Sequence, residues 1–217
     1  MQPLLRGRVV SGDALYCQKG ICRQFREAGA DYLLAVKANQ PDLLDAITLL
    51  FREPPPGEGF LSAQTVTKHG GRLETRRLRA SAVLAAYLQE AGWSDVQLVL
   101  AVETWVRWPA HPTRPTRHDV RYFLSSLPAT RAPATLLRLV RSHWHIENRL
   151  HWLRDVTLGE DAYQVRIGRA PQALAALRNT VLSLLHRSPQ PNRAAAIRAC
   201  AWSPPSQLFN LLGLTTL

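Results

Sequence analysis

The sequence predicts an α/β fold, and three successive patterns near its start support this. A short β-forming segment around Val9 and Val10 lies between glycines, and residues 17–28 then carry the apolar spacing of an amphipathic helix. The next segment, 31–37, is a continuous apolar run typical of a strand buried on both faces. Strand, helix and strand in this order predict a right-handed parallel crossover.

A second amphipathic helix is predicted directly after this unit. Pro41 suits the first position of a helix, where a backbone N–H has no partner to lose. The apolar residues that follow recur on one helical face, and the prolines at 54–56 end the pattern. Residues 1–56 are therefore expected to form one part of the α/β core.

Residues 57–130 have a different texture, with alternating or β-branched segments at 57–81, 96–105 and 120–126. We expect mostly antiparallel strands here, with one helix near 83–90, inserted into the core. A basic, proline-rich stretch at 107–119 is predicted to be a loop between two of these strands, and the plain alternative for it is a solvated surface turn.

Residues 131–217 are expected to be helical. A long helical pattern begins at Ala134 and runs to His151, and shorter ones follow at about 171–187, 192–200 and 205–212. The predicted organisation is thus a core part at 1–56, a β-rich insertion at 57–130, and a carboxyl-terminal helical region at 131–217.

The charge of the chain favours a polyanionic partner. Its 27 Lys and Arg residues against 16 Asp and Glu give a formal net charge of +11. Such an excess of positive charge favours binding to a polyanion, because contacts with phosphate groups release the counterions bound to them. Only three of the 27 are lysines, and such an arginine bias can equally reflect a GC-rich genome.

The sequence predicts a cytoplasmic protein without a membrane partner. Its three cysteines form no disulfide or metal-binding pattern, and it has neither a signal-peptide pattern nor a long apolar run.

The most informative stretch is 141–161. On a helix, His143, Glu147 and His151 recur every four residues and share one face. Three explanations stay open on the residues alone: a structural helix, a zinc site, and a carboxylate site for a divalent cation. The order H-x-x-x-E-x-x-x-H differs from the H-E-x-x-H of hydrolytic zinc enzymes.

Six ordered blocks resemble insertion-sequence transposases of the ISAs-one family, over a span from Arg6 to about Leu214. They are GDALYCQ at 12–18, DYLLAVKANQPDLL at 31–44, HGGRLETRRL at 69–78, YFLSSLP at 122–128, RSHWHIENRLHWLRDVTLGEDA at 141–162, and a helix at 171–185 with its LRNT. The resemblance implies a ribonuclease H-like core with an antiparallel insertion before the helix that bears the catalytic Glu.

The same resemblance implies two catalytic, metal-binding carboxylates. Asp13 matches the second Asp of the Asp-Asp-Glu triad, and Glu147 matches the Glu. Such enzymes hold Mg²⁺ or Mn²⁺, hard ions that prefer oxygen ligands, and two ions about 4 Å apart activate the attacking oxygen and stabilise the leaving one. Alternatively, Asp13 caps the helix that follows, and Glu147 pairs with Arg149 or Arg154.

The match departs from the wider clan in three residues and in one absence. Val140, His143 and Arg154 stand where the clan has Tyr, Arg and Lys, although the ISAs-one branch commonly has His at that second place. Asn148 and His151, with His143, are expected to orient a ligand or touch DNA. No acidic residue precedes Asp13, so the core is expected to be truncated at its amino terminus, without the first Asp.

Two functions from different classes follow. The first is a fragment of a DNA transposase that cuts and joins insertion-sequence ends, inactive alone because the first Asp is absent, in a bacterial cytoplasm and at the nucleoid when bound to DNA. The second is a non-catalytic DNA-binding or transposase-interacting protein that regulates transposition. A third interpretation is a basic RNA-associated protein, but the sequence contains no RNA-binding signature that would support it.

The expected partners are double-stranded DNA, at insertion-sequence ends and target sites, and further copies of transposase, as a homo-oligomer or a mixed oligomer with the full-length protein. Five basic residues are predicted to contact DNA. They are Lys37, Arg76, Arg77, Arg149 and Arg154.

Overall fold

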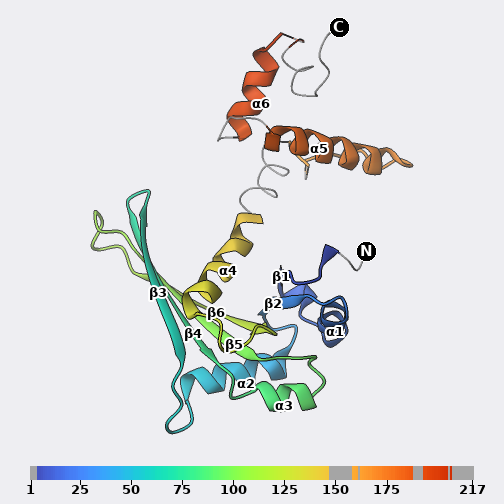
Figure 1. Ribbon diagram of the computed structural model, residues 1–217. Coiled ribbons are helices and arrows are strands. Elements are labelled where there is room, and N and C mark those ends of the chain that lie inside the picture. The colour runs from blue at the N-terminus through green and yellow to red at the C-terminus, as the bar shows by residue number, and fades with distance from the viewer. Residues whose placement is uncertain (1–3, 147–157, 161, 188–192, 205, 207–217) are drawn as a thin grey trace. The chain divides into compact units, whose positions relative to one another are not determined.

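The structure, a computed structural model, describes residues 4–146, 158–160, 162–187, 193–204 and 206 (Figure 1). The chain divides into two compact units, Met1–His143 and Trp144–Leu217, and each is described by itself.

The first unit is built on one six-stranded mixed sheet (Figure 1). The strand order is β1-β2-β6-β5-β4-β3, in which β1 and β2 are parallel and every other neighbouring pair is antiparallel. The strands are β1 Val9–Gly12, β2 Asp31–Val36, β3 Leu61–His69, β4 Arg72–Ser81, β5 Leu98–Arg107 and β6 Arg117–Ser125. The predicted parallel pair and the predicted antiparallel strands are both present.

The strands of the predicted insertion continue the sheet of the predicted core. Pairing of β2 with β6 brings Leu34 opposite Leu124 and joins the two segments along their whole length. The boundary between residues 56 and 57 therefore does not interrupt the sheet, and the division into three regions remains a prediction.

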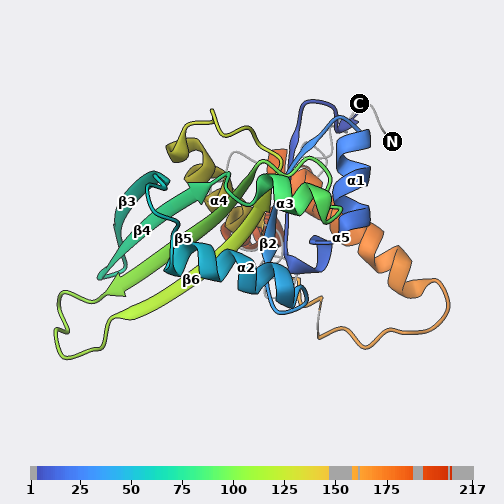
Figure 2. The same ribbon diagram turned by 90° about the horizontal axis from the view of Figure 1, so that it is seen from below.

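Three helices belong to one face of the sheet: α1 Lys19–Glu27, α2 Pro41–Arg52 and α3 Ala85–Glu90 (Figure 2). Their apolar residues join alternate residues of the strands in one buried cluster, which includes Cys22, Ile47 and Leu88 with Leu34 and Leu124. α2 begins at Pro41 as predicted, and its buried residues recur at helical spacing.

Helix α4, Pro133–Ile146, covers the opposite face, which we call the α4 face. Leu136, Leu137 and Val140 of α4 pack on the strand residues that point the other way, such as Leu33 and Leu78. Side chains alternate between the two faces along a strand. On each strand, every second residue counted from such a packed residue therefore also points to the α4 face.

The three cysteines are free. Cys17 and Cys22 are buried in the cluster beneath α2, and burial raises the pKa of both thiols. Both therefore serve as small apolar residues rather than as reactive groups.

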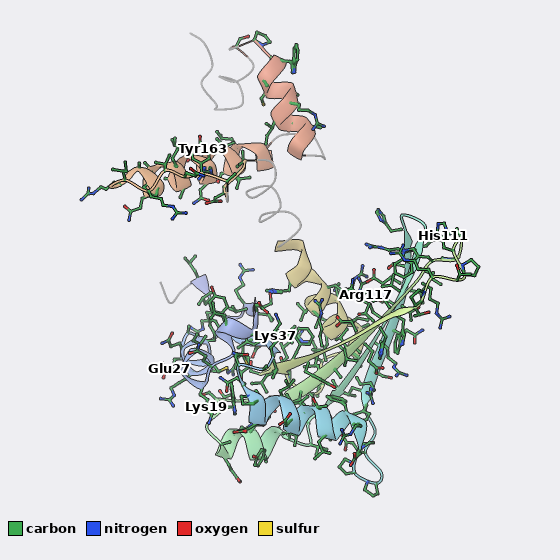
Figure 3. The ribbon with its side chains drawn as sticks, turned by 180° about the vertical axis from the view of Figure 1, so that it is seen from behind. Lys19, Glu27, Lys37, His111, Arg117 and Tyr163 are labelled. Atoms are coloured by element: carbon green, nitrogen blue, oxygen red, sulfur yellow. The ribbon has the colours of Figure 1, made fainter. Side chains whose placement is uncertain are left out.

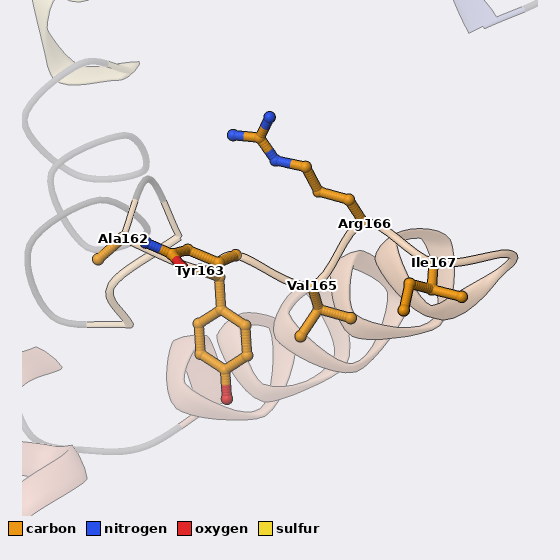
Figure 4. Close-up of a pocket in the computed structure, with 6 residues that line it drawn as sticks. Ala162, Tyr163, Val165, Arg166 and Ile167 are labelled. Atoms are coloured by element: carbon orange, nitrogen blue, oxygen red, sulfur yellow. The ribbon is translucent and has the colours of Figure 1, made fainter.

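The second unit contains α5, Ala170–Arg187, and α6, Arg193–Trp202. A shallow hollow lies beside residues 162–167 (Figure 4), and the guanidinium of Arg178 stands 4.6 Å from the ring centre of Tyr163. In the described part of the chain no helix is both long enough and apolar enough to cross a membrane. The helix predicted at 205–212 lies outside the described residues, apart from residue 206.

Candidate active site

Asp13 stands directly after β1, where the sequence predicts a strand to end. Its neighbour Gly12 is packed closely, because a Cβ added there would lie 2.9 Å from Cδ2 of Leu34 and 3.2 Å from Cβ of Tyr16. Glycine thus lets β1 approach β2 and the turn at 14–16 at the same point. Asn39 strengthens this junction by donating a hydrogen bond to the Ala14 carbonyl at 2.8 Å.

Lys37 follows β2 and reaches the carboxylate of Asp13. Its Nζ lies 3.0 Å from Oδ1 of Asp13, and both side chains are more than half exposed. The parallel register places Ser11 opposite Leu33, so that Asp13 and Lys37 share the α4 face with both. Lys37, which is labelled in Figure 3, was predicted as a DNA contact. The structure pairs it with Asp13.

His143 of α4 lies near this ion pair, and we call Asp13, Lys37 and His143 together the Asp13 corner. Its Nδ1 is 3.2 Å from Oγ of Ser11, at hydrogen-bond distance. The contact links the helix to β1, two residues before Asp13. Ser11 was not singled out from the sequence, because only the packing of α4 on β1 makes it a partner of His143.

Asp13 is held in its ionised form. Its pKa lies below the ordinary value because the Ala14 backbone amide is close to the carboxylate and Lys37 pairs with it, with a smaller contribution from His143, while partial burial opposes them. Its side chain makes no capping hydrogen bond to the short helix at Ala14–Tyr16. Asp13 nevertheless occupies the N-cap position of this helix, and the alternative that it serves only as a helix cap stays a prediction.

The second predicted carboxylate, Glu147, lies outside the described residues, one position after α4 ends at Ile146. The distance from Asp13 to Glu147 stays a prediction. Four more predicted site residues lie outside the described part, namely Asn148, Arg149, His151 and Arg154.

The carboxylate of Asp13 is a suitable ligand for a hard divalent ion, which prefers oxygen atoms. It presents an ionised, exposed carboxylate at the carboxyl end of a strand. Among residues that the structure describes, no three His, Cys, Asp or Glu side chains gather as a metal cluster. Asp13 is therefore one described residue that could serve as a ligand of such an ion.

The other two described DNA-contact candidates, Arg76 and Arg77, are neighbours on β4 and point to opposite faces. Arg76 lies on the α4 face and is paired with Glu74. Arg77 lies on the other face, where it donates to both oxygens of Glu103 at 3.0 and 3.2 Å and stacks over Trp105 at 5.2 Å.

Glu103 is the centre of an ionic network that the sequence did not indicate. Its side chain is 10% exposed and also lies 3.2 Å from Arg79 and 3.7 Å from His118. The ring of His118 stacks on Trp105 with centroids 5.0 Å apart. These residues come from three strands, so only the register of β4, β5 and β6 reveals the network.

Comparison with known proteins gives one family and several relatives. Residues 1–184 match the family model described as the transposase DDE domain. In Escherichia coli strain K12, "H repeat-associated putative transposase YhhI" is 28% identical over 188 residues, which cover 83% of this chain and 48% of that protein. "Putative transposase YncI" of Escherichia coli O157:H7 is 32% identical over 190 residues, 83% of this chain and 46% of that protein. The chain spans about half the length of these curated relatives.

Proposed function

The chain belongs to the transposase DDE domain family, and from this premise we propose that it carries the later part of a metal-dependent DNA strand-cleavage and strand-transfer site of the ISAs-one branch. The observation that carries the proposal is the corner formed by Asp13, Lys37 and His143. It places an ionised carboxylate beside α4, and Glu147 is the next residue in the sequence after Ile146 of that helix.

A ribonuclease H-like core agrees with the arrangement of the first unit. A parallel pair of strands joined by a helix, with a carboxylate at the end of one strand, is the part of such a core that this chain would contribute. The antiparallel strands β3–β6 then correspond to an insertion that extends the same sheet.

We assign Asp13 and Glu147 as the ligands of Mg²⁺ or Mn²⁺. When bound, such an ion activates the attacking oxygen and stabilises the leaving oxygen of the DNA strand. His143 positions the corner by linking α4 to Ser11 of β1. Lys37 keeps Asp13 ionised and is within reach of a phosphate next to it.

Two carboxylates hold a divalent ion less firmly than the three of a complete triad, and loss of one ligand displaces the ion from productive geometry. We therefore propose that this chain alone cleaves DNA slowly or not at all. The complete activity, in the bacterial cytoplasm, would need a further carboxylate, which another segment or another copy of transposase would provide.

A second candidate is a non-catalytic protein that binds DNA or transposase and regulates transposition. The observation that favours it is the ion pair itself, because the ammonium group of Lys37 neutralises the charge of the described carboxylate. Mixed assembly with an active transposase would then be its mode of action.

Nicking of supercoiled plasmid DNA in Mg²⁺ or Mn²⁺ separates the two. We expect at most slow nicking by the parent chain, and loss of any nicking in Asp13→Asn and in Glu147→Gln. The exposed Asp119→Asn, on β6, is the matched control and should behave as the parent. Nicking that survives both site substitutions would contradict the assignment, whereas fast nicking by the parent alone would contradict only its proposed inactivity.

A further inference from the structure

Strand β4 presents a row of charged residues beyond its apolar part on the α4 face. Leu78 and Ala80 pack beneath α4. Every second residue of a strand points to the same face, so Arg76, Glu74 and Arg72 also point to the α4 face. Neighbouring strands add Thr65 and Thr104, which pair directly with Arg76. The α4 face thus changes from apolar to basic along a single strand.

The guanidinium of Arg76 is only partly satisfied in this position. Its Nη2 donates to Glu74, whereas Nη1 is buried and has no hydrogen-bond partner among the described residues. The hydroxyl of Thr65, its register partner, is likewise buried without a described partner. An unsatisfied buried donor is unfavourable, and the Arg76 side chain is still 21% exposed, so an acceptor that approaches from solvent would be favoured.

Positive charges converge on this place. The pKa of Arg76 is lowered, first because burial disfavours the charged guanidinium, and then because the charges of Arg141 and Arg72 oppose it, while Glu74 acts in the other direction. Three arginines around one carboxylate leave an excess of positive charge. An anion between them would relieve the repulsion.

Helix α4 brings Arg141 to the cluster. Arg141 follows Leu137 by one helical turn, and Leu137 is buried against the sheet, so Arg141 lies at the edge of the packed surface. His143, two positions later, is on the other flank of the helix, where it contacts Ser11 of β1. The helix therefore stands between the arginines on one side and the Asp13 corner on the other, all on the α4 face.

We propose that Arg72, Arg76 and Arg141 form a binding site for the phosphate backbone of double-stranded DNA on the α4 face. The proposal rests on the proposed function, since it explains how a DNA strand would be held on the face that carries Asp13. Residues four apart on a strand are separated by about 13 Å, so Arg72 and Arg76 would contact different phosphates. Guanidinium groups suit phosphate because they donate two parallel hydrogen bonds.

The alternation along β4 provides a matched comparison. Arg76→Gln and Arg141→Gln each remove one charge from the proposed site. Arg77, which the sequence predicted as a DNA contact, faces the other way and is held by Glu103, so the proposed site excludes it. Arg77→Gln therefore removes the same charge from a neighbouring position outside the site. Lys68→Gln is a second control, because Lys68 is exposed and pairs with Leu73 on that opposite face.

Fluorescence anisotropy of a labelled DNA duplex over a series of salt concentrations measures the number of phosphate contacts. For the full chain, we expect the slope of log affinity against log salt to fall by about one in Arg76→Gln and in Arg141→Gln, and by about two in the double variant. Arg77→Gln and Lys68→Gln should leave the slope unchanged. Arg76→Lys should retain the slope, which separates a lost charge from a misfolded chain.

Unchanged slopes in both Arg76→Gln and Arg141→Gln would overturn the proposal, as would an equal loss in Arg77→Gln or Lys68→Gln. Failure of the parent chain to bind duplex DNA, or tighter binding to duplex RNA of the same sequence, would overturn it too. Asp13→Asn and Glu147→Gln should not lower the slope. The phosphate site can therefore fail while the cleavage site stands, and the reverse.

Discussion

The ammonium group of Lys37 lies 3.0 Å from the carboxylate of Asp13, so the residue after one parallel strand neutralises the residue after its neighbour. The two are 24 positions apart and meet because β1 and β2 run side by side in the same direction. The predicted metal ligand Asp13 is therefore paired with a cationic side chain. Several measurable consequences follow from this corner and from the sheet behind it.

Replacing Lys37 by Met should raise the pKa of Asp13 towards its ordinary value of 3.8, because the paired charge that favours the carboxylate is lost. In the parent, the depressed pKa contributes stability that is present above the unfolded value and is lost as the pH falls through the folded value. Carboxyl carbon chemical shifts followed by NMR between neutral and strongly acidic pH measure it. An unchanged midpoint in Lys37→Met would show that the ion pair does not form in solution.

Gly12→Ala should destabilise the fold by about 1–3 kcal/mol, because the added methyl group meets the buried side chain of Leu34. Gly20 offers the control, since a Cβ at that position in α1 meets nothing within 4 Å. Gly20→Ala should leave stability unchanged or raise it by up to about 1 kcal/mol. Urea unfolding followed by circular dichroism distinguishes them, and equal stabilities for the two variants would contradict the close packing of β1 on β2.

Glu103→Gln should cost about 2 kcal/mol of stability, because Arg77, Arg79 and His118 then share a weakened acceptor in a nearly buried place. The exposed pair of Asp119 with Arg121 on β6 provides the comparison. Asp119→Asn should change the unfolding free energy by no more than about 0.5 kcal/mol. If Glu103→Gln is as stable as Asp119→Asn in thermal and urea unfolding, the network adds nothing to the sheet.

Local elements of this fold follow from sequence patterns, whereas their pairing does not. The helix at Pro41–Arg52 and the strand at Asp31–Val36 were predicted because apolar spacing and a proline define them within a dozen residues. The pairing of Leu34 with Leu124 joins segments 90 positions apart. It depends on how the whole sheet packs, and no local pattern specifies it.

The candidate site shows the same division. Asp13 was placed correctly at the end of a strand, but the partnership of Ser11 with His143 required the packing of α4. Arg76 and Arg77 looked equivalent as DNA contacts in the sequence. Alternation shows that they face opposite ways, yet only the structure reveals which face α4 covers and which one Glu103 occupies.

The central claim is that Asp13 and Glu147 bind one divalent ion, and Mn²⁺ titration followed by electron paramagnetic resonance tests it most directly. The account predicts that Asp13→Asn and Glu147→Gln each weaken Mn²⁺ binding at least about tenfold, that the double variant is little worse than either, and that Asp119→Asn binds as the parent does. Unchanged Mn²⁺ affinity in either single variant would contradict a shared ion.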